Sequence, residues 1–229
     1  MNILVVSGTG TEIGKTIVTA AVAAACAGHR VAVLKPAQTG LEPGEPGDAA
    51  EVARLAGSHV TAVELARFPE PLAPATAARR AGMAPVRPYE IAAAAEKLAT
   101  DHDLVLVEGA GGLLVRFDDD GATLADAARL LAAPVLVVTP AALGTLNSTA
   151  LTSEALRARG LDCLGVVVGS MPAEPGLAER CNLADLPVAA GAPLLGVVPA
   201  GAGSLAPADF RARSASWLAK PLGGNRLPG

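Results

Sequence analysis

The sequence has very few aromatic residues. Phe, Tyr and Trp make up 2% of its 229 residues, with one Trp and one Tyr. Surfaces that bind single-stranded nucleic acid stack bases on aromatic side chains, so a surface of that kind is not expected. The formal net charge of −4 provides no basic excess for a nucleic-acid backbone or an anionic membrane. We therefore expect neither nucleic acid nor membrane as a partner.

Cysteine and long apolar runs are also scarce. The three cysteines, Cys26, Cys163 and Cys181, follow no disulfide or zinc-ligand spacing, and they suit a reducing compartment. The longest apolar stretch, residues 17–27, is shorter than the roughly 20 residues that span a bilayer. A predicted strand and a glycine-rich loop come first in the chain, where a secretory leader would lie. We expect a cytoplasmic protein.

Apolar residues make up 51% of the sequence, enough to build a buried core. Short Val-, Ile- and Leu-rich runs alternate with longer Ala-rich segments, which predicts an α/β fold with a doubly wound, mostly parallel sheet and helices on both faces. About seven strands are expected, at residues 2–7, 31–35, 60–65, 104–108, 135–139, 163–168 and 194–198. Helices are expected at residues 15–28, 48–56, 89–100, 123–131, 145–159 and 207–218.

No composition shift divides the chain, so residues 1–220 are expected to form a single domain. Residues 221–229 have no periodicity and are expected to form a flexible tail. Asp48 and Thr123 suit helix N-caps, and Gly28 and Gly160 suit C-terminal caps. Ligands of such sheets bind at the carboxyl ends of the strands, so functional residues are expected there.

The first predicted strand leads into a glycine-rich loop, GTGTEIGKT, at residues 8–16. Backbone N–H groups of such a loop and of the following helix bind phosphate. Lys15 can then reach the outer phosphates, and the Thr16 hydroxyl can ligate Mg²⁺. Gly8 stands one residue too early for the common pattern, so the loop is a lengthened variant. We interpret it as an ATP-binding loop.

Further motifs follow the later strands: KPAQTG at residues 35–40, GDA at 47–49, VEGAGG at 107–112, LGTLN at 143–147 and LGVVP at 195–199. Together with the loop, and in this order, they resemble the dethiobiotin synthetase family over residues 4 to about 200. The resemblance implies a P-loop ATPase fold and a cyclo-ligase of biotin biosynthesis. Such an enzyme converts 7,8-diaminopelargonate, CO₂ and ATP to dethiobiotin, ADP and phosphate, through a carbamate and a carbamic-phosphoric anhydride.

The chemistry of that reaction assigns roles to charged residues. A carbamate and a triphosphate must meet, so Lys35 is assigned to the carbamate and Lys15 to the β- and γ-phosphates, as the catalytic residues. Thr16, Asp48 and Glu108 supply oxygen ligands for Mg²⁺. The wider nucleotide site is expected to comprise Glu12, Ile13, Gly14, Lys15, Thr16, Ile17, Asp48, Glu108, Gly109, Ala110, Gly111, Gly169, Ser170, Val197, Val198 and Pro199.

The diamine site is expected to comprise Thr11, Lys35, Thr39, Leu143, Gly144, Leu146 and Asn147. The stretch from Gly144 begins a predicted helix, whose free N–H groups suit the substrate carboxylate. The resemblance further implies a homodimer in which Leu143, Gly144, Leu146 and Asn147 serve the neighbouring subunit's site.

The chain departs from the family pattern at several positions. Gly10 replaces a usual Asp, Arg116 a frequent Pro, and Ser148 a frequent His. The sixth predicted strand typically ends in an Asn that pairs with adenine, whereas here Gly169 and Ser170 follow Val168. A site without such polar pairing discriminates weakly between bases. We therefore predict that other nucleoside triphosphates are accepted alongside ATP.

Two other functions stay open. One is a partition or septum-type ATPase switch whose output is binding to a partner or a surface. Gly10 stands where those ATPases carry a second lysine, and the chain has no amphipathic basic tail, so both features count against a switch. The other is a related amide-forming ligase that acts on a different acid, which the residues alone do not exclude.

Overall fold

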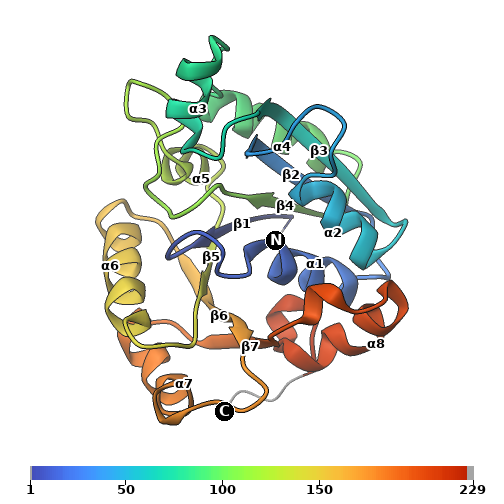
Figure 1. The fold of residues 1–229 in the computed structure, drawn as a ribbon, viewed down its shortest axis with the longest axis vertical. Helices are drawn as coiled ribbons and strands as arrows, with labels where there is room; N and C mark the ends of the chain where they lie inside the picture. Colours follow the sequence, from blue (N-terminus) through green and yellow to red (C-terminus); the bar gives the residue numbers. More distant parts are fainter. Residues whose placement is uncertain (1, 226–229) are drawn as a thin grey trace.

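The computed structural model describes residues 2–225. In this part of the chain, seven strands form one parallel sheet with helices on both faces (Figure 1), which confirms the predicted fold class. The sheet order is β3-β2-β4-β1-β5-β6-β7. The strands are β1 (Ile3–Gly8), β2 (Val31–Thr39), β3 (Val60–Phe68), β4 (Leu104–Glu108), β5 (Val135–Thr139), β6 (Cys163–Met171) and β7 (Leu194–Pro199).

Helices cover both faces of the sheet, so its central strands are mostly apolar and almost entirely buried. On one face, α1, α2 and α8 pack around Val18, Val52 and Phe210; on the other, α4 and α5 contribute Ile91 and Leu124. The helices are α1 (Lys15–Ala25), α2 (Asp48–Ala56), α3 (Pro74–Ala81), α4 (Pro88–Ala99), α5 (Leu124–Leu130), α6 (Thr145–Ala158), α7 (Leu177–Ala190) and α8 (Pro207–Trp217).

Strand β2 is four residues longer than predicted, because it continues through Pro36 to Thr39. Proline cannot donate a hydrogen bond to a neighbouring strand, which is why it reads as a strand end. Here β2 pairs with β4 only as far as Leu34, and beyond that point with β3 alone. Pro36 therefore falls where one side of β2 has no strand beside it, and Lys35 lies within the strand.

Two helices, α3 and α7, were not predicted from the sequence. Helix α7 contains Pro187, and the stripe that it buries begins with a polar residue, followed by Leu186 and Ala190. That polar residue, Asn182, donates a hydrogen bond from Nδ2 to the Ala141 carbonyl oxygen at 2.8 Å. The sequence does not indicate this helix, because a polar residue takes one of its buried positions and a proline lies inside it.

Helix ends match the prediction at some positions only. Thr123 caps α5 with a reciprocal hydrogen-bond pair to Asp126, as expected. The predicted N-cap Asp48 is instead the first helical residue of α2, and Gly47 occupies the cap position. Helix α1 ends at Ala25, before Gly28. In the described chain, none of the helices has both the length and the apolar character needed to cross a membrane.

The predicted flexible tail is wrong for residues 221–225. A short 3₁₀ helix spans Lys220–Leu222, and the Leu222 side chain is buried against α1 and α8. The backbone N–H of Asn225 donates to the Ala215 carbonyl at 2.8 Å. The apolar side chain of Leu222 and this bond hold the segment on α8. Residues 226–229 of the expected tail lie outside the described residues.

Candidate active site

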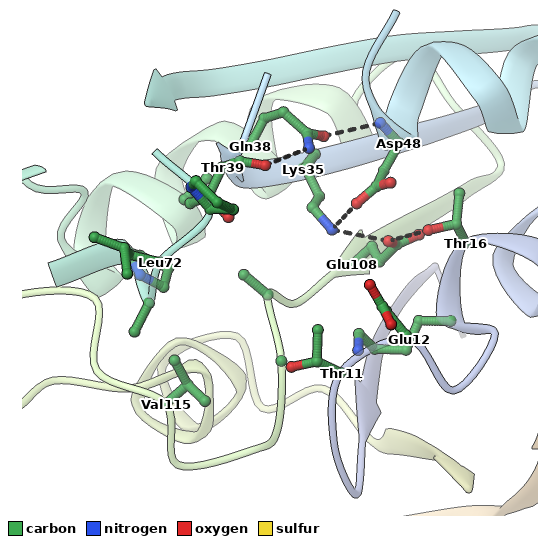
Figure 2. A pocket seen from close by; sticks show the side chains of 18 of the residues that line it. Thr11, Glu12, Thr16, Lys35, Gln38, Thr39, Asp48, Leu72, Glu108 and Val115 are labelled. Atoms are coloured by element: carbon green, nitrogen blue, oxygen red, sulfur yellow. Dashed lines mark hydrogen bonds and ion pairs between the residues drawn. The ribbon is translucent and has the colours of Figure 1, made fainter. Parts of the chain in front are cut away.

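A cavity of about 800 Å³ opens at the carboxyl ends of β1, β2 and β4 (Figure 2). Most of the predicted phosphate, metal and diamine residues line it: Thr11, Glu12, Gly14, Lys15, Thr16, Ile17, Lys35, Thr39, Asp48, Glu108, Ala110 and Gly111. These residues come from four segments of the sequence, at residues 11–17, 35–39, 48 and 108–111. The topology of a parallel sheet brings them together, because the strand ends meet at one edge.

Lys35 is the centre of an ionic cluster in this cavity. Its ammonium is 2.9 Å from Glu108 Oε1, forms an ion pair with Asp48 Oδ2, and donates to the Gly109 carbonyl oxygen at 3.2 Å. Burial by itself lowers the pKa of Lys35, but the Glu108 and Asp48 carboxylates outweigh burial and raise it above its ordinary value. Lys35 is therefore cationic at neutral pH.

Thr16 completes the cluster. Its hydroxyl donates to Glu108 Oε1 at 2.9 Å, so that one carboxylate oxygen accepts from both Thr16 and Lys35. Figure 2 shows the three predicted metal ligands, Thr16, Asp48 and Glu108, converging on the region of the Lys35 ammonium. The sequence prediction that these three side chains lie close together is confirmed in geometry.

The second catalytic candidate, Lys15, begins α1 and is also buried. Its Nζ donates to the Gly10 carbonyl oxygen at 2.8 Å. Burial, and then the positive charge of Lys35, lower the pKa of Lys15 to about 8, against smaller opposing effects of Glu108 and Asp48. An anion placed between the two lysines would offset their mutual repulsion, as expected of a site for phosphate.

The phosphate loop is held tightly against the end of β6. Gly14 has a φ of 92°, and a Cβ there would stand 2.4 Å from the Gly169 carbonyl oxygen. Glu12 adopts a φ of 57°, which is uncommon for a residue with a side chain. Both residues thus have left-handed backbone shortly before α1, and the first N–H groups of a helix suit a phosphate.

The oxygen-rich cluster fits a divalent cation. Glu108 Oε2 is buried and has no hydrogen-bond partner among the described residues. Mg²⁺ prefers oxygen ligands and is commonly held by one or two carboxylates together with substrate phosphates and water. In the described part of the chain, no group of three or more His, Cys, Asp and Glu side chains could hold a metal. A cation here would accordingly depend on the Thr16 hydroxyl and on the nucleotide.

Several predicted nucleotide residues do not line this cavity: Ile13, Gly109, Gly169, Ser170, Val197, Val198 and Pro199. Gly169 still touches the loop, because a Cβ on it would lie 2.0 Å from the Ile13 carbonyl oxygen. Val198 is fully buried in the core, so its side chain cannot contact a ligand. Ser170 is exposed at the end of β6, next to β7.

The predicted diamine residues at the start of α6 also lie outside the cavity: Leu143, Gly144, Leu146 and Asn147. Leu143 is 85% exposed. Gly144 caps α6 without a side-chain hydrogen bond. The Thr145 N–H donates to the Ala142 carbonyl oxygen at 3.2 Å, so the N–H groups of Leu146 and Asn147 are the ones left for a ligand. The start of α6 lies away from α2 (Figure 1).

Sequence reasoning missed an apolar wall of the cavity. Pro71, Leu72, Ala73, Pro74 and Val115 line the side opposite the ionic cluster. Pro71, Leu72 and Ala73 precede α3, Pro74 begins it, and Val115 lies in a loop, so only their apolar character could have pointed to them. Gln38 was missed as well, although it lies inside the quoted KPAQTG motif and lines the cavity.

The chain is similar to known proteins over nearly its whole length. A family model described as an AAA domain matches residues 2–207. The ATP-dependent dethiobiotin synthetase BioD of Streptomyces coelicolor is 69% identical over 226 residues, covering 98% of this chain and 94% of that protein. The protein of the same name from Saccharopolyspora erythraea is 67% identical, covering 98% of each chain.

Among solved structures, a ParA family ATPase from Chlorobium tepidum has a TM-score of 0.59 at 11% identity, covering 97% of this chain and 96% of that one. The MinC:MinD complex of Aquifex aeolicus has a TM-score of 0.56 at 14% identity, covering 93% and 86%. At such low identity the likeness concerns the fold alone. The family assignment rests on the relatives that match over nearly the full length. The chain belongs to the ATP-dependent dethiobiotin synthetase family and is a ligase.

Proposed function

We propose that this chain converts 7,8-diaminopelargonate and CO₂ to dethiobiotin, with ATP as the co-substrate and ADP and phosphate as the other products. The observation that supports this most is the arrangement of Lys15 and Lys35 around one cavity that the phosphate loop also lines. The high identity to the dethiobiotin synthetases of two actinobacteria supports the same reaction. A switch ATPase shares the fold, but its reaction gives no role to a lysine such as Lys35, which lies on β2 and lines a cavity large enough for a diamine.

The first steps of the reaction bring two anions together. One amine of the substrate reacts with CO₂ to give a carbamate, and a carbamate oxygen attacks the γ-phosphorus, so that ADP leaves. Lys35 neutralises the carbamate because its pKa is raised and it stays protonated. Lys15 holds the β- and γ-phosphates, and the loop N–H groups orient them. The second amine then attacks the carbamic carbon and releases phosphate.

Thr16, Asp48 and Glu108 are proposed to hold Mg²⁺. When bound, the cation neutralises phosphate charge that develops during transfer. The buried, unpartnered oxygen of Glu108 is the observation in favour of this site. The chain itself contributes a hydroxyl and two carboxylates that are already gathered by Lys35.

The diamine is proposed to lie with its amines near Lys35 and Thr39 and its methylene chain along the apolar wall. Pro71, Leu72 and Val115 give that chain a surface of matching polarity. The carboxylate at the far end then needs a positive partner, and the start of α6 in a second copy of this chain supplies one. The exposure of Leu143 (85%) and Leu151 (58%) on and beside α6 suits a homodimer at that face.

The nucleotide base is proposed to lie beyond the loop, near the ends of β6 and β7. Ser170 offers a small hydroxyl there in place of a side-chain amide. Because a single hydroxyl pairs with a base less specifically than an amide does, we predict relaxed selectivity among nucleoside triphosphates. Comparison of kcat/KM for ATP, GTP, CTP and UTP tests this, and an ATP preference of about a thousandfold would contradict it.

Phosphate release from the purified protein tests the function as a whole. We expect release from MgATP to require both 7,8-diaminopelargonate and bicarbonate, with dethiobiotin detected by mass spectrometry. Turnover that ignores the diamine would favour an ATPase switch. Turnover that requires a different acid would favour the related amide-forming ligase.

A further inference from the structure

Gln38 is a buried polar residue beside the reaction site. It lies on β2, three residues after Lys35, and is 5% exposed. Its side-chain Oε1 accepts a hydrogen bond from the backbone N–H of Asp48 at 2.8 Å, and its Nε2 donates to the Thr39 carbonyl oxygen at 3.3 Å. Figure 2 shows both bonds, with the amide placed between the strand and the start of α2. Both polar atoms of the Gln38 amide therefore already have hydrogen-bond partners.

The bond to Asp48 replaces a cap that α2 lacks. The first N–H groups of a helix need acceptors, which an N-cap side chain usually provides. The N-cap residue of α2 is Gly47, which has no side chain to offer. A Cβ at Gly47 would stand 2.8 Å from Gln38 Oε1 and 2.2 Å from Glu64 Oε1. A side chain at Gly47 would crowd Glu64, Gln38 and Arg67. Gln38 provides the missing acceptor from a neighbouring strand.

The capped residue is the one whose carboxylate faces Lys35. Asp48 keeps 35% of its side chain exposed, so packing alone does not fix its direction. Its backbone is fixed by Gln38 and its carboxylate by Lys35, and both of these residues come from β2. The position of the carboxylate relative to Glu108 and Thr16 depends on the place where α2 begins. That place is set by the Gln38 amide.

The loop that leads into α2 has a separate anchor. Arg67 on β3 donates to the carbonyl oxygens of Glu42 at 3.2 Å and of Glu45 at 2.7 Å, and pairs with Glu64 at 2.8 Å. These contacts hold the loop on β3 without Gln38. Loss of the Gln38 amide should therefore leave the loop attached and displace only the first turn of α2.

We propose that Gln38 is a positioning residue, whose amide aligns the Asp48 carboxylate with Glu108 and Thr16 as a ligand set for a divalent cation. The proposal rests on the proposed function, because it assigns that cation to the ATP-dependent reaction. Groups that orient a metal ligand commonly contribute ten- to a hundredfold to metal affinity. Gln38 would raise the affinity for the cation by orienting Asp48, without being a ligand itself.

The test measures cation affinity directly. Mn²⁺ is titrated into the protein with a non-hydrolysable ATP analogue and followed by electron paramagnetic resonance. Gln38→Met keeps the size of the side chain and removes the amide, and we expect about tenfold weaker Mn²⁺ affinity. Gln38→Glu retains an acceptor for the Asp48 N–H and is expected to restore most of that affinity. Analogue binding without metal should change by less than about twofold in either variant.

Thr123→Ala is the matched control, because it removes the N-cap of α5, which does not line the cavity. It should lower thermal stability and leave Mn²⁺ affinity unchanged. Gln38→Asn, one methylene shorter, serves if Gln38→Met does not fold, and it should also weaken Mn²⁺ binding. Unchanged Mn²⁺ affinity in folded Gln38→Met or Gln38→Asn would overturn the proposal, and so would the absence of Mn²⁺ binding to the wild type. Loss of diamine-dependent turnover in the wild type would instead count against the proposed function, since Mn²⁺ affinity is measured without the diamine.

Discussion

At the scale of single residues, the account depends on a buried ammonium shared by two carboxylates. Lys35 is enclosed with Glu108, which is fully buried, and with Asp48, which is partly exposed. Removal of the cation would leave an uncompensated buried charge, which is costly. The same ammonium is the group proposed to stabilise the carbamate. Stability and activity are thus coupled at this residue.

We predict that Lys35→Met lowers kcat at least about a hundredfold, because a preorganised positive charge at the reacting anion is lost. It should also lower the free energy of unfolding by about 3–5 kcal/mol, since the buried Glu108 and the partly exposed Asp48 lose the cation that they share. Mg²⁺ should recover part of this loss, and should stabilise the variant more than the wild type in urea denaturation. A variant with full activity would remove Lys35 from the mechanism.

A second residue-scale prediction concerns a surface ion pair far from the site. Arg30 donates to Asp103 from its side chain and its backbone and lowers the pKa of that carboxyl from 3.8 to about 2. A carboxyl whose pKa is lower in the folded than in the unfolded protein stabilises the fold at pH values above its unfolded pKa. This contribution is lost as the pH falls toward the folded pKa. The urea midpoints of the wild type and of Asp103→Asn should therefore differ above pH 4 and converge toward pH 2. A difference that is the same at both pH values would contradict the assignment.

Residues that follow a strand could be predicted from the sequence, and residues between motifs could not. Thr16 lies in the first turn of α1, shortly after Gly14, and Glu108 ends β4 beside Gly109, so a polar residue at either place indicates a ligand site. Lys35 was predicted at a strand end before Pro36, although β2 continues to Thr39. Gln38 gave no such signal, because its role depends on the place where α2 begins in space. The tertiary approach of Glu64 to Gly47 is equally invisible in the sequence.

At the scale of elements, the contact between the phosphate loop and β6 connects the nucleotide site to the sheet. We predict that Gly169→Ala raises KM for ATP at least about tenfold, because its Cβ would overlap the Ile13 carbonyl oxygen at 2.0 Å and displace the loop. Gly28→Ala is the control, since a Cβ there meets nothing within 4 Å. Equal nucleotide affinity in both variants would show that the loop tolerates the displacement.

Helices and strands could be predicted from the sequence where a single pattern, such as an apolar run, marked them. Uninterrupted apolar runs located the central strands, because buried parallel strands have no polar face. The edge strand β3 gave a weaker signal, since Thr61 and Glu64 interrupt its apolar residues. Helix α7 was missed, since Asn182 takes a buried position and Pro187 lies inside the helix. The end of β2 was placed too early at Pro36, because pairing with one neighbour only cannot be read from local composition.

At the scale of the whole molecule, the fold is shared with ATPases that have other outputs, so the fold does not identify the reaction. The distinctive property is the proposed site between two copies of the chain. The start of α6 lies outside the cavity of its own subunit, and a carboxylate bound there would belong to a substrate in the other subunit. Activity should then depend on residues from both copies.

Mixing inactive variants tests this arrangement. Lys35→Ala disables the cavity, and Asn147→Ala removes a side chain predicted to serve the neighbouring subunit's diamine site. A 1:1 mixture allowed to exchange subunits should regain up to about one quarter of wild-type activity, because half the dimers are mixed and each has one intact site. A mixture with no more activity than its components would indicate that each subunit works alone.

A crystal structure of the protein with Mg²⁺, a non-hydrolysable ATP analogue, 7,8-diaminopelargonate and bicarbonate tests the central claim most directly. We predict that the γ-phosphate and a carbamate on the substrate amine lie within van der Waals contact, between Lys15 and Lys35, with the cation bound to Thr16, Asp48 and Glu108. A carbamate far from the γ-phosphate, or a cation held by other residues, would contradict the account.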